Sequence, residues 1–234
     1  MKIKGLQKLT LLDYPEKIAC TVFLGGCNFR CPFCHNASLV LPERESEGIS
    51  EAEFFAFLES RVGRLGGVCV SGGEPTLHPS LPEFIGKIKA LGFSVKLDTN
   101  GYRPDALRAL FSEGLVDYVA MDIKSSLEGY GSCVGIPEFN TEPIRESAAL
   151  LMEGGVDFEF RTTVVRELHT EEDIRAIGEW LAGGERFYLQ SFKDSGDIIT
   201  AGLSPYSDEE IMKRMVHYLE KNIQLYEELS EEYD

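Results

Sequence analysis

Three cysteines within eight residues are the part of this sequence best suited to chemistry. They are Cys27, Cys31 and Cys34, in the segment Cys-Asn-Phe-Arg-Cys-Pro-Phe-Cys. Cysteine thiolates hold iron–sulfur clusters, and four of them complete the ligation of a [4Fe–4S] cluster. Three thiolates with no nearby fourth would hold three irons and leave the last iron with an open coordination site. The spacing therefore predicts a [4Fe–4S] cluster at which a small molecule could bind iron.

Zinc binding and disulfide exchange are the alternatives for this cysteine segment. A structural zinc site usually has four ligands arranged in pairs two residues apart, and His35, directly after Cys34, is poorly placed as a fourth ligand. Cys31 and Cys34 also form a Cys-x-x-Cys pair, the motif of redox-active disulfides. No thioredoxin-like helix pattern follows that pair, and Cys27 would have no role in it.

The elements that must position these cysteines alternate between strand and helix patterns. A strand followed by a helix and a parallel strand implies a right-handed crossover, and six such units are two short of a closed eight-stranded barrel. We predict an α/β fold with an open, curved parallel sheet, a partial (β/α)6 TIM-like barrel. The predicted strands cover 18–24, 67–71, 93–98, 116–122, 157–165 and 186–191, and the predicted helices cover 50–61, 81–91, 104–113, 141–153 and 170–181.

Four polar or glycine-rich peptides follow strands of this predicted sheet, at 71–75, 98–101, 122–124 and 190–193. Taken singly, each is an ordinary loop or turn sequence. The carboxyl ends of parallel strands meet at one edge, where the sites of such folds lie. Together with the cysteine segment, which follows the first predicted strand, these peptides predict a single site.

The cysteine spacing, with Phe33 before the last cysteine, resembles the signature of the radical S-adenosylmethionine (radical SAM) superfamily. Within it, the sequence is similar to the small activases of glycyl radical enzymes, above all the anaerobic ribonucleotide reductase-activating proteins and their pyruvate formate-lyase-activating relatives. The resemblance runs over nearly the whole length. The peptides that carry it lie at 13–15, 34–36, 71–75, 97–101, 121–124 and 160–164.

The resemblance implies a [4Fe–4S] cluster and S-adenosyl-L-methionine as cofactors. It implies reductive cleavage of S-adenosylmethionine to methionine and a 5′-deoxyadenosyl radical, which abstracts hydrogen from a glycine Cα of a partner glycyl radical enzyme. The expected electron donor is a flavodoxin or ferredoxin-type reductant, and a monovalent cation is expected near Asp98, Thr99 and Asp122. The cluster ligands would be Cys27, Cys31 and Cys34, and the cofactor contacts Phe33, Gly72, Gly73, Glu74, Asp98, Asp122, Lys124, Arg161 and Lys193.

Several of these contacts also have a physical reason. Gly72 and Gly73 would let the backbone approach the methionine end of the ligand. Asp98 and Asp122 offer acceptors for its ammonium group or ribose hydroxyls, while Lys124 and Arg161 offer cations for its carboxylate. Lys193 stands where the activases can carry a histidine near the ribose.

Composition indicates a single domain. The chain has 234 residues, of which 43% are hydrophobic, enough for one α/β domain with a sizeable core. We expect that domain to span 1–234, with a covering helix at about 207–230, where apolar residues recur at helical spacing. Cys20 and Cys69, which lie in β-branched runs, are expected in the core.

Charge and hydropathy exclude several classes of partner. The formal net charge is −16, which argues against binding nucleic acid or an anionic membrane surface. The first residues show no signal-peptide pattern, and no run approaches the ~18 apolar residues that would span a membrane. The expectation is a cytoplasmic protein without a nucleic-acid or membrane partner.

Two other functions stay open at this point. One is a radical SAM enzyme that acts on a small molecule or peptide, similar to 7-carboxy-7-deazaguanine synthase. The other is an iron–sulfur electron-transfer module without catalysis, which the peptides at 71–75, 98–101 and 122–124 count against. No acid–base dyad is evident, since His78, His169 and His217 are expected on loops or helix surfaces.

Overall fold

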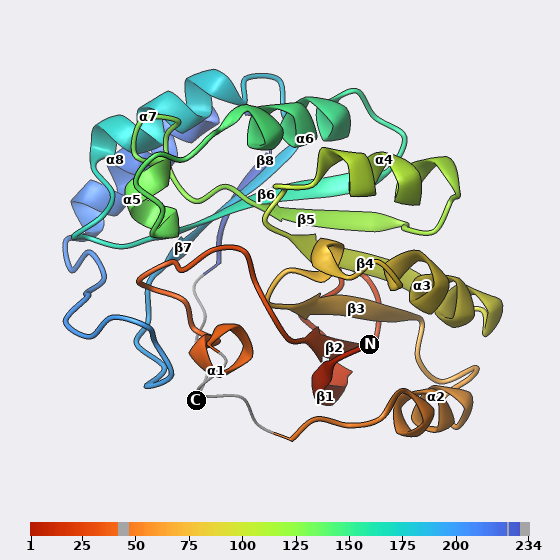
Figure 1. Cartoon of the computed structure of the whole chain (residues 1–234). Helices are drawn as coiled ribbons and strands as arrows, with labels where there is room; N and C mark the ends of the chain where they lie inside the picture. Colours follow the sequence, from red (N-terminus) through yellow and green to blue (C-terminus); the bar gives the residue numbers. More distant parts are fainter. Residues whose placement is uncertain (42–46, 224, 230–234) are drawn as a thin grey trace.

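The computed structural model describes residues 1–41, 47–223 and 225–229, and its central feature is an open sheet whose strand order follows the chain (Figure 1). β1 (Ile3–Thr10) runs antiparallel to β2 (Ala19–Leu24), and every later pair is parallel. The parallel strands after β2 are β3 (Gly67–Gly72), β4 (Ser94–Thr99), β5 (Tyr118–Asp122), β6 (Asp157–Val164), β7 (Arg186–Ser191) and β8 (Leu225–Leu229).

Helices connect the parallel strands and cover one face of the sheet. Their starts are encoded locally: Ser50 and Thr170 form capping boxes, and Pro104 occupies the first turn of its helix, where its missing N–H costs nothing. They are α1 (Ala37–Val40), α2 (Glu51–Glu59), α3 (Leu81–Ala90), α4 (Pro104–Ser112), α5 (Tyr130–Val134), α6 (Glu142–Met152), α7 (Glu171–Trp180) and α8 (Glu209–Glu220), with a 3-10 turn at Pro75–Leu77.

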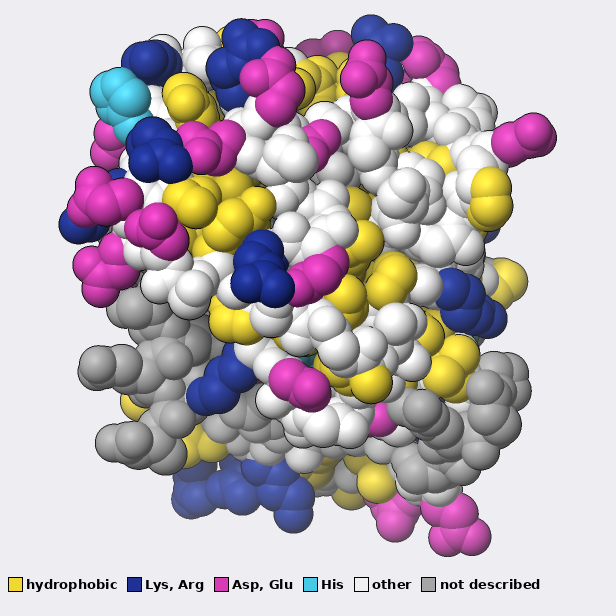
Figure 2. Space-filling model, turned by 90° about the vertical axis from the view of Figure 1, so that its left-hand side faces the viewer, with side chains coloured by type: hydrophobic (Ala, Val, Ile, Leu, Met, Phe, Trp, Pro, Cys, Tyr) yellow, Lys and Arg dark blue, Asp and Glu magenta, His cyan; other side chains and the backbone are white. Residues whose placement is uncertain are grey.

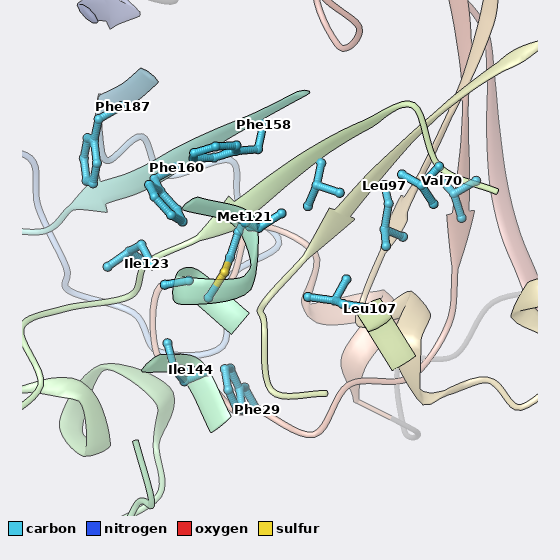
Figure 3. Close-up of a cluster of buried hydrophobic side chains, with 14 of the residues drawn as sticks. Phe29, Val70, Leu97, Leu107, Met121, Ile123, Ile144, Phe158, Phe160 and Phe187 are labelled. Carbon is cyan, nitrogen blue, oxygen red and sulfur yellow. The ribbon is translucent and has the colours of Figure 1, made fainter. Parts of the chain in front are cut away.

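The hydrophobic core lies between the sheet and these helices. Figure 3 shows Met121 and Phe160 from β5 and β6 together with Leu107 and Ile144 from α4 and α6. Phe29, from the cysteine segment, belongs to the same cluster. The segment that carries the cysteines is therefore anchored in the core.

The opposite face of the sheet is polar. Side chains alternate along a strand, so the apolar positions of β4 and β6 face the helices while Lys96, Asp98, Glu159 and Arg161 form ion pairs across the other face. Lys96 and Glu159 are almost fully buried. The face of the sheet opposite the helices therefore carries charged side chains.

The predicted open parallel α/β sheet is confirmed, and all six predicted strands are present. The structure adds β1 at one edge and β8 at the other, neither of which the sequence analysis included. The covering helix expected at about 207–230 ends at Glu220, because Leu225–Leu229 pair with β7 instead; positions 224 and 230 lie outside the described residues. Within the described residues, no helix is long and apolar enough to cross a membrane.

Candidate active site

A cavity of about 250 Å³ lies at the carboxyl ends of the parallel strands, and all three clustered cysteines line it. Figure 2 shows the left-hand side of Figure 1, on which α1 and α5 lie, with hydrophobic side chains across its middle and acidic and basic ones around them. Of the sequence-predicted residues, those that line the cavity are Cys27, Cys31, Cys34, Phe33, Gly72, Gly73, Asp98, Asp122, Lys124 and Arg161.

The cysteine loop, residues 27–36, is held on one side by the α5 region. Phe29 packs edge-on against Tyr102 and Phe139, with ring centroids 5.7 and 5.3 Å away. The Arg30 N–H donates to the Val134 carbonyl at 2.9 Å. The sequence analysis predicted no helix at the position of α5, although the aromatic residues of this region were a usable signal.

A long connection after β7, residues 192–208, holds the other side of the cysteine loop. The Asp197 carboxylate accepts hydrogen bonds from the Ser38 N–H at 3.1 Å and the Ser38 hydroxyl at 2.7 Å. The Thr200 N–H donates to the Pro32 carbonyl at 2.9 Å. The His35 ring lies 5.3 Å from the Phe192 ring, which is buried. Segments far apart in sequence therefore enclose the cysteines.

Burial raises the pKa of Cys27 to about 11 and that of Cys31 to about 12, so both thiols are protonated at neutral pH without metal. The nearby Lys124 ammonium opposes this shift at both cysteines and at Cys34. Three thiols facing one cavity that no other cysteine lines fit an iron–sulfur cluster with three protein ligands. Cluster binding must displace their protons.

The glycines that follow β3 bring two loops into contact. Gly72 has a φ of +123°, and a Cβ there would lie 2.2 Å from the Leu24 carbonyl oxygen. A Cβ on Gly73 would lie 2.1 Å from the carbonyl oxygen of Gly26 and 3.3 Å from the Cys27 Cβ. Both glycines line the cavity, but the steric need for them comes from the start of the cysteine loop.

Glu74 differs from the expectation of a cofactor contact. Its side chain is fully buried and is not among the residues that line the cavity. The carboxylate accepts hydrogen bonds from the Thr76 N–H at 3.0 Å and hydroxyl, the Thr99 hydroxyl at 2.8 Å and the Asn100 N–H at 2.6 Å. It ties the loop after β3 to the loop after β4, so it positions the site rather than entering it.

Asp98, Asp122, Lys124 and Arg161 come together in one ion-pair network. Lys124 Nζ lies 3.0 Å from Asp122 Oδ2, and Arg161 Nε lies 3.0 Å from Asp122 Oδ1. Arg161 also approaches Asp98 Oδ1 to 3.7 Å, and Lys96 Nζ reaches the same oxygen at 3.4 Å. Burial alone would raise the pKa of Asp122, but Lys124 and Arg161 more than offset it and lower that pKa to about 2.

This ion-pair network affects how S-adenosylmethionine and a monovalent cation, the two expected ligands, would fit the cavity. Asp98 Oδ1 is buried and makes no hydrogen bond, although the Lys96 and Arg161 cations lie near it. Asp122, Lys124 and Arg161 line the cavity, where they can meet the charged groups of a bound ligand. A monovalent cation fits less well, since Asp98 and Asp122 already face three cationic side chains and the Thr99 hydroxyl donates to Glu74. The residues present fit a polar cofactor, and the expected cation stays a prediction.

Lys193 does not reach the cavity. Its side chain is exposed to solvent, and Gln190 lines the cavity from β7 instead. Gln190 lies three residues earlier, at the end of the strand, and its Oε1 accepts a hydrogen bond from the Thr163 hydroxyl at 3.4 Å. The strand was predicted with the bounds that β7 has, and Lys193 lies two residues beyond its end, so the geometry favours Gln190 over Lys193 as the side chain nearest a ligand.

His169 was expected on a surface and is instead buried beside the site. The Val165 N–H donates to its Nδ1 at 3.0 Å, so its Nε2 carries the hydrogen and donates to the Lys124 carbonyl at 2.8 Å. Its ring also packs against Phe33. Nothing in the local sequence revealed this, since the contacts join residues about 45 and 136 positions apart.

Comparisons with known proteins agree with this geometry. Residues 21–181 match the family model described as the radical SAM superfamily. A protein named as a glycyl-radical enzyme activating enzyme in Methanocaldococcus jannaschii is 34% identical over 201 residues, which cover 83% of this chain and 82% of that protein. The pyruvate formate-lyase-activating enzyme of Listeria monocytogenes is 33% identical over 105 residues, 43% of this chain and 42% of the enzyme.

A solved structure shares the fold. Streptococcus suis SuiB superposes with a TM-score of 0.67 at 14% identity, over 89% of this chain and 48% of SuiB. The family model spans the cysteine loop and most of the strands that line the cavity, those from β3 to β6, and continues through α7. Given that match, the three cysteines and the long match to an activating enzyme, the chain belongs to the radical SAM superfamily.

Proposed function

We propose that this protein is the activase of a glycyl radical enzyme, with anaerobic ribonucleotide reductase as the first partner to test. One observation carries the proposal: the match to the activating enzyme of Methanocaldococcus jannaschii extends over four-fifths of both chains. A match confined to the cluster motif would indicate the superfamily alone.

The residues of the cavity have defined tasks in this function. A [4Fe–4S] cluster with S-adenosylmethionine would supply a 5′-deoxyadenosyl radical. Cys27, Cys31 and Cys34 would hold the cluster, and Lys124 with Arg161 would orient the carboxylate of S-adenosylmethionine. Phe33 and the enclosing connection after β7 keep bulk water from the reacting atoms.

The site needs no acid–base pair for this chemistry, because the cofactors supply the reactive species and the protein positions them. Burial lowers the pKa of His169 and favours its neutral form, while its two backbone contacts fix the orientation of the ring. It therefore serves as a support for the backbone at Lys124. The hydrophobic side chains across the middle of the face in Figure 2 offer a surface on which a protein partner could dock.

The test is an anaerobic mixture of the reconstituted protein, a reductant, S-adenosylmethionine and the large subunit of an anaerobic ribonucleotide reductase. A glycyl doublet in the EPR spectrum together with 5′-deoxyadenosine is the expected result. 5′-Deoxyadenosine without the doublet would exclude this partner and favour a small-molecule or peptide substrate. Formation of neither product with an intact cluster would refute the activase function.

Paired cysteine variants control this experiment. Cys31→Ser removes a thiolate from the cavity and should abolish both products. Cys20→Ala changes a cysteine buried in the core of β2, away from the cavity, and should leave both products in place.

A further inference from the structure

Two N–H groups converge on the sulfur of Cys27. The backbone N–H of Phe29 lies 3.4 Å from Cys27 Sγ, and the side-chain Nδ2 of Asn100 lies 3.9 Å from it. The first donor belongs to the cysteine loop itself. The second comes from the turn after β4, more than seventy residues away in sequence, and is a side chain that can be replaced.

The orientation of the Asn100 amide is fixed by its other partners. The Tyr102 N–H donates to Asn100 Oδ1 at 3.0 Å, so the oxygen of the amide faces Tyr102. The NH2 group therefore faces the cysteine loop, where Nδ2 donates to Asn28 Oδ1 at 2.8 Å. With one hydrogen directed at Asn28, the second is available to the sulfur of Cys27.

The turn that carries Asn100 is also held rigidly. Asn100 is 5% exposed, and its backbone N–H donates to the buried Glu74 carboxylate at 2.6 Å. The Gly101 N–H donates to the Thr99 hydroxyl, which in turn donates to Glu74. The amide is thus positioned before any cofactor binds, which is the condition for a constant effect on a neighbouring charge.

We propose that Asn100 raises the reduction potential of the iron–sulfur cluster through its hydrogen bond to Cys27 Sγ, which rests on the cluster of the proposed function. A ligand sulfur becomes more negative when the cluster gains an electron. A hydrogen-bond donor therefore stabilises the reduced cluster more than the oxidised one, and hydrogen bonds to cluster sulfurs are among the factors that set the potential. Asn100 acts through Cys27, so it is a positioning residue.

The experiment is an EPR-monitored redox titration of the full-length reconstituted protein, without S-adenosylmethionine or partner. Asn100→Leu keeps the approximate shape of the side chain and removes the donor. We expect the equilibrium constant for one-electron reduction to fall about tenfold, a shift of ~59 mV to lower potential. ENDOR spectra in D2O should show one fewer exchangeable proton coupled to the cluster.

Two further variants separate the hydrogen bond from a general disturbance of the turn. Asn100→Asp keeps the acceptor for Tyr102, loses the N–H and adds a negative charge, so its potential should fall at least as far. Ser147→Ala removes a hydroxyl on α6 that donates to the Gly101 carbonyl in the same turn; Ser147 does not line the cavity and makes no contact with the Asn100 amide. Its potential should match that of the unsubstituted protein.

An unchanged midpoint in the Asn100 variants, or an equal shift in Ser147→Ala, would overturn the inference. Loss of the cluster in both Asn100 variants would also overturn it, because Asn100 would then be required for assembly rather than for tuning. If the unsubstituted protein bound no cluster at all, the proposed function would fall as well. An intact cluster whose potential does not change when Asn100 is replaced refutes this inference and leaves the proposed function untouched.

Discussion

Replacing Gly73 with alanine tests why a glycine is needed beside the cysteines. The added Cβ would lie 2.1 Å from the carbonyl oxygen of Gly26, whereas real Cβ atoms essentially never come closer than 3.0 Å. The two loops must therefore separate by about 0.9 Å, the difference between those distances. The φ of Gly73 lies outside the left-handed region that favours glycine, so the effect is steric.

The size of the effect follows from this displacement. Forcing an extra carbon into a packed contact typically costs ~1–3 kcal/mol of folding free energy. The displaced carbonyl immediately precedes Cys27, and a misplacement of ~1 Å can slow a positioned reaction ~100-fold. We expect Gly73→Ala to bind less cluster than the unsubstituted protein and to form 5′-deoxyadenosine about 100-fold more slowly.

The assay combines iron and sulfide content, thermal unfolding of the apoprotein and the rate of 5′-deoxyadenosine formation. Gly86→Ala is the matched control, because Gly86 lies within α3 and the nearest atom to its added Cβ is 4.0 Å away. Alanine in a helix should stabilise that variant by roughly 0.5–1 kcal/mol. A Gly73→Ala protein with a full cluster, unchanged unfolding and only weaker S-adenosylmethionine binding would refute the reasoning, since the glycine would then serve the ligand.

Three further outcomes follow from the site. Cys31→Ser should lose the cluster absorbance near 400 nm measured after anaerobic reconstitution, roughly the region of thiolate-to-iron charge transfer, and an intact spectrum would contradict its role as a ligand. Lys124→Ala should raise the Kd for S-adenosylmethionine about tenfold, as for loss of one charge-assisted hydrogen bond, with the cluster retained; an unchanged Kd by equilibrium dialysis would remove Lys124 from the carboxylate site. Burial lowers the pKa of His169 below its ordinary 6.5, so the unfolded chain binds the proton more tightly and apoprotein stability should fall as the pH drops below about 6.5. His169→Gln should flatten that decline in urea unfolding, and an identical pH profile would show that another group causes it.

The sequence predicted the fold and the place of the site because both depend on local patterns. Apolar runs marked the parallel strands from β2 to β7, and the polar peptides after them identified the edge where the cavity lies. The sequence analysis did not predict the two edge strands, β1 and β8, and the reason is physical. β1 alternates irregularly in burial, and Leu225–Leu229 contain two glutamates, so neither matches the pattern of a strand buried on both faces.

The roles of individual side chains could be predicted less well, since they depend on contacts between distant segments. Glu74 was grouped with the cofactor contacts because the family resemblance implied it together with Gly72 and Gly73, yet its carboxylate points into a buried network. His169 and Asn100 act across 45 and 73 residues of sequence. Only the arrangement of the folded chain shows which side chain faces the cavity and which supports one that does.

The connection after β7 has a consequence for how the protein is made. It meets the cysteine loop through Asp197 and Ser38, which are 159 residues apart, and through the contact between Thr200 and Pro32. During synthesis the three thiols emerge from the ribosome well before the segment that encloses them. We expect alkylation of ribosome-stalled chains to stay rapid at Cys27 until Thr200 has emerged, and early protection would contradict this. Lasting enclosure of the cluster would then have to wait until the connection after β7 has been made.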